Sequence, residues 1–167
     1  GIAHVDITTS EFFTTHLPTN EVALELESLR PSELLLPKGI PILDEWRMAP
    51  VTELEADSFN LQIAQEVLQE HFGVMTLEGY GCAHLPVAIQ AAGAILDYLK
   101  ETQRSALAQI TSLATYSTQS FMSLDPQTRR NLELFQGGRW ASSDQSLLRV
   151  LDNTRTPMGG RLIRRWL

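Results

Sequence analysis

The sequence predicts a mixed α/β domain followed by an α-helical segment, and three features carry this prediction. A strand–turn–strand pattern at the start is followed by a helical pattern and then by three consecutive leucines, which is the order of an α/β fold. Residues 86–107 form one long apolar helical pattern. The last forty or so residues carry the helix starts Asp-Pro and Thr-Pro, which indicate short helices.

The composition allows one large domain or two small ones. The chain has 167 residues, of which 43% are hydrophobic, enough for a core. Cys82 is the single cysteine, which excludes an internal disulfide and an all-cysteine metal site and fits a reducing, cytoplasmic location. The sequence has no run of 18 apolar residues, so we expect no membrane partner.

The charge changes sign along the chain. Residues 1–100 carry 4 Lys and Arg against 15 Asp and Glu, whereas residues 101–167 carry 9 Arg against 5 Asp and Glu. We therefore interpret the helix at 86–107 as a strut that joins an acidic part to a basic part. The overall net charge of −7 argues against DNA affinity of the chain by itself.

The first elements are a hairpin, a helix and a buried strand. Residues 1–17 alternate well enough for two strands with a turn at 8–10. Asn20 is a good N-cap for a short helix that Pro31 stops. Residues 33–36 contain three leucines in a row, which predicts a strand covered on both faces, as in a parallel sheet.

The middle of the chain is irregular at 37–58 except for a short strand at 51–54. Ser58 is placed to cap a helix over residues 59–72, and Gly73 follows as its C-terminal residue. A Gly-Tyr-Gly loop at 79–81 leads to the strut.

The strut begins at Pro86, which suits a first helical turn. Gly93 lies among alanines, so we expect a second element to pack closely there. A continuous helix over 86–107 would be roughly 30 Å long. Its apolar N-terminal half should lie against the sheet, and its polar half, from Lys100 onward, should leave the first domain.

Short elements follow the strut. We expect a strand at 120–124, a helix at 125–135, a loop at 139–145, and a helix from Leu147 to Asp152. Thr156 and Pro157 start the last helix. Its apolar side chains are Met158, Leu162, Ile163 and Trp166.

The sharpest candidate for chemistry is Asp6, on the first strand beside the turn residues Thr9, Ser10 and Glu11. In ribonuclease-H-like and sugar-kinase folds such a strand and turn hold Mg²⁺ or phosphate. A Mg²⁺-dependent nuclease would use Asp6, Glu11 and Asp44. The alternative is a purely structural turn, which the absence of a turn glycine favours.

The remaining candidates have plain structural interpretations. His4, His16, His71 and His84 lack the spacing of a metal site on a helix, and Cys82 suits a packed side chain. Gly79 and Gly81 are only a piece of a dinucleotide-binding pattern. We therefore predict no catalytic, cofactor-binding or metal-binding residue.

Four arginines gather on or beside the last helix. They could contact nucleic-acid phosphates or a neighbouring domain, and an autonomous basic nucleic-acid-binding module is one alternative function. The other interpretation is a solvated helix face, with cations near the helix C-terminus. These residues are Arg155, Arg161, Arg164 and Arg165.

Long segments of the chain resemble the bacterial MutS family, the mismatch-recognition ATPases of DNA repair. In the second half these are LKETQ, LDxxTRRNLEL and VLDxTRTPMGGRLxRRWL. In the first half they are GIAHVDITTSEFF, LRPSELLLP and HFGVMTLEGYG. The resemblance covers nearly the whole chain.

The resemblance implies a specific domain plan. Residues 1–105 would be the connector domain, of ribonuclease-H-like topology without its first strand, and residues 106–167 would begin the helical core (lever) domain. The mismatch-reading domain, the DNA clamp and the ATPase would lie outside this chain, which we expect to be a piece of a larger protein. The chain would then be no enzyme and bind no cofactor, because ATP and Mg²⁺ bind elsewhere in the family.

The resemblance also implies partners. The connector would relay between DNA-binding and ATP-hydrolysing parts and offer a docking surface for MutL. Gln65, Glu66 and Gln69 lie on the helix associated with that docking. Mismatched duplex DNA and the remaining MutS domains would be further partners. We also expect self-association through apolar side chains left uncovered in the second half, namely Leu147, Leu151, Ile163 and Trp166.

Overall fold

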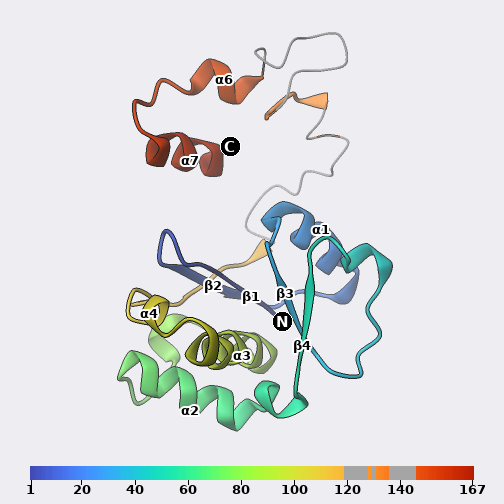
Figure 1. Ribbon diagram of the computed structural model, residues 1–167, viewed down its shortest axis with the longest axis vertical. Helices are drawn as coiled ribbons and strands as arrows, with labels where there is room; N and C mark the ends of the chain where they lie inside the picture. Colours follow the sequence, from blue (N-terminus) through green and yellow to red (C-terminus); the bar gives the residue numbers. More distant parts are fainter. Residues whose placement is uncertain (119–127, 129–130, 136–145) are drawn as a thin grey trace. The chain divides into compact units, whose positions relative to one another are not determined.

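The computed structural model describes residues 1–118, 128, 131–135 and 146–167, apart from the side chains of Ala106 and Arg165. The chain divides into two compact units, unit 1 (Gly1–Phe121) and unit 2 (Met122–Leu167). Figure 1 draws unit 1 from blue to amber and the helices of unit 2 in red.

Unit 1 is a mixed α/β structure with two small sheets. The first sheet has the order β1-β2-β5, in which β1 (Ile2–Asp6) is antiparallel to β2 (Glu11–Thr15) and β5 (Ala114–Thr115) is parallel to β2. The second sheet pairs β3 (Leu34–Pro37) in parallel with β4 (Val51–Leu54). The hairpin, its turn and the parallel pairing of the leucine strand are as the sequence predicts.

The helices of unit 1 are α1 (Thr19–Leu29), α2 (Leu61–Phe72), α3 (Pro86–Thr102) and α4 (Arg104–Leu107). Three short 3₁₀ helices lie between them, η1 (Asp44–Trp46), η2 (Ala56–Phe59) and η3 (Glu78–Tyr80). Two predicted caps are wrong. Helix α1 starts two residues earlier than predicted, at Thr19 after Pro18. Helix α2 is capped by Asn60, whose side chain accepts from the Gln62 and Ile63 amides, because η2 occupies the residues around Ser58.

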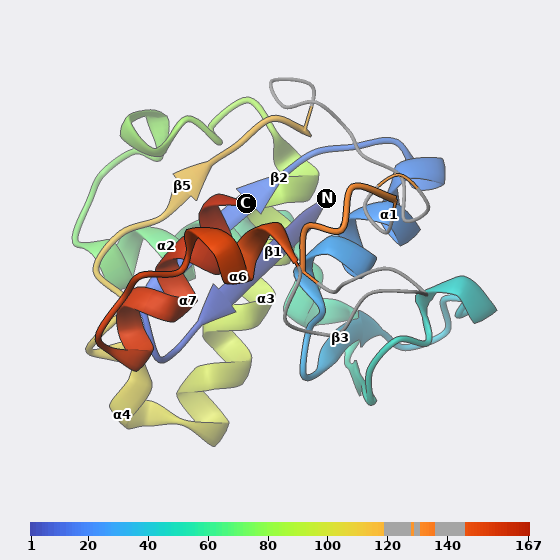
Figure 2. The ribbon, with the colours of Figure 1, turned by 90° about the horizontal axis from the view of Figure 1, so that it is seen from above.

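The two faces of the first sheet are covered differently. Helix α3 packs on the face that carries Val5 and Phe12, and the buried Thr14 hydroxyl donates to the Ala88 carbonyl at 2.9 Å. The opposite face carries His4 and Phe13, whose rings contact Tyr116. Figure 2 shows β5 beside β2 at the sheet edge. The expected burial of β3 on both faces is wrong, because its residues are only half-buried in a two-stranded sheet.

Helices α2 and α3 form the centre of the core, and Gly93 is the reason they approach closely. A Cβ on Gly93 would lie 2.4 Å from the Ala64 Cβ and 2.6 Å from its Cα. The predicted close packing at Gly93 is therefore confirmed. The core extends through Leu68, Leu96 and Leu99.

The strut prediction is wrong beyond residue 102. Helix α3 ends at Thr102 because Gln103 leaves the helical conformation, with φ −144° and ψ 61°. The chain then returns to unit 1, where Ile110 and Leu113 are buried in the same core. The charged residues at 100–104 face solvent at the end of α3, and they do not indicate that the chain leaves unit 1. The long helix α3 is therefore the central helix of unit 1, and it does not lead out of that unit.

Unit 2 contains α6 (Leu147–Leu151) and α7 (Pro157–Trp166) among its described residues. The Ser146 hydroxyl accepts from the Arg149 amide at 3.2 Å, and the Thr156 hydroxyl accepts from the Gly159 amide at 3.1 Å. The predicted Thr-Pro start is thus confirmed. The predicted strand at 120–124 and loop at 139–145, and most of the helix at 125–135, lie outside the described residues.

Candidate functional site

Asp6 organises the turn between β1 and β2. Its Oδ1 atom accepts from the Thr8 amide at 2.8 Å, the Thr8 hydroxyl at 2.7 Å and the Thr9 amide at 3.3 Å. The Thr8 hydroxyl contributes most to lowering the pKa of the Asp6 carboxyl below its usual value. Ser10 follows with φ +61°. One oxygen of the carboxylate, Oδ1, is thus engaged in the turn, which supports the structural interpretation.

Of the three carboxylates proposed for a nuclease, Asp6 and Glu11 belong to one turn, whereas Asp44 lies on η1. Glu11 accepts from the Thr9 hydroxyl at 3.2 Å, within the same turn as Asp6. Asp44 lies on η1, fully exposed, with its Oδ1 atom 3.4 Å from the Arg47 Nε atom. Within the described part of the chain, no group of three His, Cys, Asp or Glu side chains is placed to hold a metal ion. The structure does not support the nuclease alternative.

Cys82 and His71 serve packing and hydrogen bonding. Cys82 is completely buried in the core of unit 1, and burial raises the pKa of its thiol. The His71 Nε2 atom lies 2.8 Å from the Ile110 carbonyl oxygen, so it donates there. These contacts agree with the structural interpretation of both residues.

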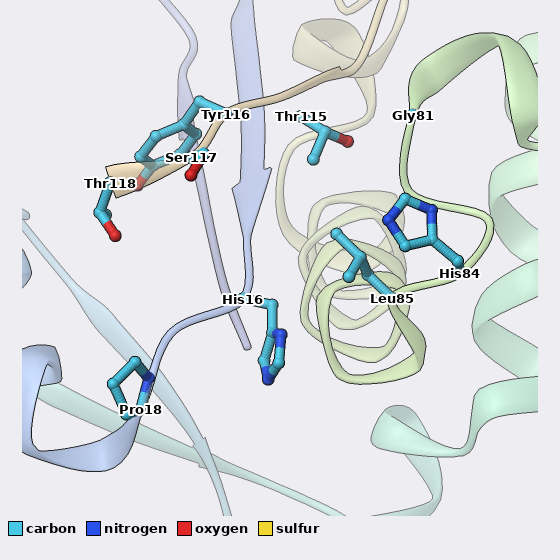
Figure 3. A pocket seen from close by; sticks show the side chains of 9 residues that line it. All are labelled: His16, Pro18, Gly81, His84, Leu85, Thr115, Tyr116, Ser117 and Thr118. Carbon is cyan, nitrogen blue, oxygen red and sulfur yellow. The ribbon is translucent and has the colours of Figure 1, made fainter. Parts of the chain in front are cut away.

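An open hollow lies where β2 and β5 end and α3 begins (Figure 3). Its volume is about 450 Å³. In Figure 3, His84 and Leu85 lie on one side and Tyr116, Ser117 and Thr118 on the other. The lining is His16, Pro18, Gly81, His84, Leu85, Thr115, Tyr116, Ser117 and Thr118. None of these described residues is an acid, a lysine or an arginine, so they do not supply the carboxylates of a metal centre.

Sequence reasoning missed this hollow because it missed β5. Residues 114–118, Ala-Thr-Tyr-Ser-Thr, are rich in β-branched and aromatic side chains, which favour strands. The pairing of Thr14 with Thr115 joins residues far apart in the chain, and no local pattern shows such a pairing.

Helix α2 carries the three residues predicted to meet MutL. Glu66 is exposed and accepts from the Gln62 side chain at 3.2 Å, whereas Gln65 and Gln69 are half-buried. The Gln69 side chain donates to the Met75 carbonyl at 3.0 Å. Met75 itself is 91% exposed beyond the helix end. The surface around α2 therefore combines polar side chains with exposed apolar ones, namely Ile63 on the helix and Met75 beyond its end.

Helix α7 presents both basic and apolar side chains to solvent. Arg155, Arg161 and Arg164 are exposed, and the Arg164 guanidinium lies 5.3 Å from the centre of the Phe135 ring. The side chain of Arg165 lies outside the described residues. Trp166 is 76% exposed and Met158 is 70% exposed. Within unit 2, the expected uncovering of apolar side chains is clear for Trp166, Leu147 and Leu151, whereas Ile163 is half-buried.

Comparison with protein families assigns both parts of the chain. Residues 1–111 match the family model of MutS domain II, and residues 127–167 match that of MutS domain III. The chain belongs to the MutS family. The mixed α/β structure of unit 1 is consistent with MutS domain II.

Curated MutS proteins align along the entire chain. A DNA mismatch repair protein MutS of Dehalococcoides mccartyi (strain ATCC BAA-2266 / KCTC 15142 / 195) is 44% identical over 168 residues, which cover 100% of this chain and 20% of the relative. MutS of Methanococcoides burtonii is 40% identical over 178 residues, 20% of its length. MutS of Synechococcus elongatus is 43% identical over 184 residues, 21% of its length. The chain thus spans about a fifth of the length of these relatives.

No helix among the described residues of this MutS chain is long and apolar enough to cross a membrane.

Proposed function

We propose that this chain acts in DNA mismatch repair as a non-catalytic part of a MutS protein, relaying between the parts that bind DNA and the parts that hydrolyse ATP. The observation that carries the proposal is the match to MutS domains II and III, in that order, along one chain. The proposal keeps the expected division, with residues 1–105 in the connector and residues 106–167 in the beginning of the core domain, although Ile110, Leu113 and β5 pack within unit 1. Mismatched DNA, ATP and Mg²⁺ would be bound by other parts of the MutS protein, in the cytoplasm.

The connector would have a ribonuclease-H-like topology. An antiparallel hairpin, a helix and a parallel strand pair follow one another in unit 1, as β1, β2, α1, β3 and β4. This order supports the proposed topology without any metal-binding role for its carboxylates. Asp6 would then occupy the strand position at which metal-binding proteins of this fold carry an Asp, but here it would only stabilise the turn.

Helix α2 is the proposed docking surface for MutL. Its exposed Glu66 and the neighbouring Gln65 and Gln69 supply hydrogen-bonding groups, and Met75 supplies an apolar contact at the helix end. A polar surface with exposed apolar side chains such as Met75 fits a transient protein–protein contact.

The test is binding of purified MutL to the 167-residue chain, measured by biolayer interferometry. Glu66→Lys should weaken binding at least tenfold, because it reverses a charge on the proposed surface. Glu27→Lys is the matched control, since Glu27 is an exposed glutamate on α1 and undergoes the same charge change. Equal binding of both variants, or no binding of the unmodified chain, would contradict the proposed docking surface.

The exposed arginines of α7 would contact DNA phosphate or another MutS domain, and the apolar side chains beside them would be covered by that domain or by a second copy of the chain. Arg161 and Arg164 lie on α7 together with the exposed Met158 and Trp166, and Arg155 lies just before the helix. Apolar groups exposed in this way favour association.

A further inference from the structure

Residues 108–116, which we name the strap, follow α4 and close over unit 1. Ile110 and Leu113 are only 2% and 4% exposed, because both side chains enter the main core. Next, β5 adds two residues to the edge of the sheet, pairing Ala114 with Phe13 and Thr115 with Thr14. The strap is thus held by two apolar anchors and a very short ladder.

Side-chain hydrogen bonds tie the strap to four elements. The His71 side chain on α2 donates to the Ile110 carbonyl at 2.8 Å. The Thr115 hydroxyl donates to the Tyr80 carbonyl at the end of η3, and the Thr15 hydroxyl of β2 donates to the Tyr116 carbonyl, both at 2.7 Å. The fourth tie, to α1, comes from the side chain of Tyr116.

Tyr116, the last residue of the strap, is held by hydrogen bonds and two ring contacts. Its hydroxyl donates to the Glu25 Oε1 atom of α1 at 2.5 Å, and its amide donates to the Thr14 carbonyl at 3.1 Å. Its ring meets the rings of His4 and Phe13 edge-on, at 5.8 and 6.3 Å between centroids. Burial, and then the bond to Glu25, raise the pKa of the Tyr116 hydroxyl. It therefore stays a proton donor, and a bond of this kind to a carboxylate is stronger than one between neutral groups.

The strap differs from the rest of the core in how little regular structure it has. Helix α3 carries seven buried residues along 17 positions, whereas the ladder of the strap is two residues long. Segments at a sheet edge with few backbone bonds open at a lower free energy than core helices. Nine released residues could extend over about 30 Å.

We infer that the strap is a releasable latch, closed by the Tyr116–Glu25 hydrogen bond, which opens while the rest of unit 1 stays folded. When the latch opens, residues 108–116 detach from unit 1 and become part of a long flexible linker. A role of the strap in the relay rests on the proposed function. The opening of the strap is a property of unit 1 and does not rest on that function. The opening can be measured in the absence of DNA and nucleotide. A strap that does not open is therefore distinguishable from a chain that does not act in the relay.

The test is native-state hydrogen exchange of the full 167-residue chain at low urea concentrations. Amides of residues 113–116 should exchange through an opening with weak urea dependence, and amides of residues 88–99 through one with strong urea dependence. A single shared opening, with one urea dependence for both sets, would overturn the inference.

Two variants separate the latch from global unfolding. Tyr116→Phe removes the bond to Glu25 and should accelerate exchange of residues 113–116 about tenfold. Ala64→Gly weakens α2 where it packs on Gly93 of α3, several residues before the His71 contact with the strap. It should therefore accelerate exchange of residues 88–99 several-fold and leave exchange of residues 113–116 unchanged. Equal acceleration of both sets by Ala64→Gly would show that the strap opens only when the whole unit unfolds.

Tyr98→Phe is the matched control for Tyr116→Phe. The Tyr98 hydroxyl donates to the Glu33 Oε1 atom at 2.9 Å, but at an exposed position outside the strap. This variant should leave exchange of residues 113–116 unchanged. If Tyr116→Phe changed exchange in the strap no more than Tyr98→Phe does, the Tyr116–Glu25 bond would not be the lock. Glu25→Gln keeps an oxygen acceptor and should open the strap less than Tyr116→Phe.

Discussion

Gly93 shows how a single missing methyl group determines the packing of unit 1. Alanine is the better helix former by about 1 kcal/mol, so helix propensity alone predicts that Gly93→Ala is stabilising. The Cβ would however lie 2.4 Å from the Ala64 Cβ, where the backbone of α2 leaves no room. We expect Gly93→Ala to lower the free energy of unfolding by about 1–3 kcal/mol in urea titrations. Gly79→Ala is the control, because a Cβ at that residue would have no atom within 4 Å and should have little effect.

Asp6 predicts a pH dependence whose sign follows from the turn. Its pKa is lower in the folded chain than in the unfolded chain, chiefly because of the Thr8 hydroxyl. The carboxylate therefore stabilises the fold above the unfolded pKa of about 3.9, and this contribution is lost as the pH falls through the lower folded pKa. Urea unfolding should show Asp6→Asn less stable than the unmodified chain at pH 6, with the difference narrowing below about pH 4. A difference that grows at low pH would contradict this explanation of the turn.

At the scale of elements, α3 is expected to respond unevenly to substitution. Leu96 is completely buried, so Leu96→Ala should cost about 2–5 kcal/mol of stability. Lys100 forms an exposed pair with Glu70 at 3.3 Å, and Lys100→Ala should change stability by less than about 1 kcal/mol. Thermal unfolding of both variants checks the contrast. Similar losses from both would mean that the solvent side of α3 carries more of the fold than its buried side.

The elements also show where sequence reasoning succeeds. Local signals predicted the hairpin, the end of α2 at Gly73 and the Thr156 cap of α7, because each rests on neighbouring residues. The Asp6 carboxylate accepts hydrogen bonds from the neighbouring turn residues Thr8 and Thr9, as the structural-turn alternative predicts. The exit of the chain from unit 1 could not be predicted, because Ile110 and Leu113 reach a core built mostly from residues more than ten positions away. The hollow lined by His84 and Thr115 depends on that same long-range pairing.

For the whole molecule, net charge sets the expected behaviour toward DNA. A chain with a net charge of −7 repels phosphate, so the 167-residue chain should not bind duplex DNA with sub-micromolar affinity at physiological salt. Fluorescence anisotropy over a range of salt concentrations measures this directly. Tight binding with a steep salt dependence would instead favour an autonomous nucleic-acid-binding module built on the arginines of α7.

The uncovered side chains of α7 predict association of the chain with itself. Trp166 and Met158 are both largely exposed, and burying them between copies would remove apolar area from water. Sedimentation velocity should show a concentration-dependent increase in mass, which Trp166→Glu reduces. A monomer at all concentrations would contradict this prediction.

A chimera tests most directly whether this chain performs the part of MutS domains II and III in mismatch repair. The matching fifth of the Dehalococcoides mccartyi relative would be replaced by this chain and expressed in cells that lack MutS. We expect the chimera to lower the spontaneous mutation rate to nearly the level given by the intact relative. A chimera that folds and accumulates normally, yet leaves the mutation rate as high as in cells without MutS, would contradict the proposed function.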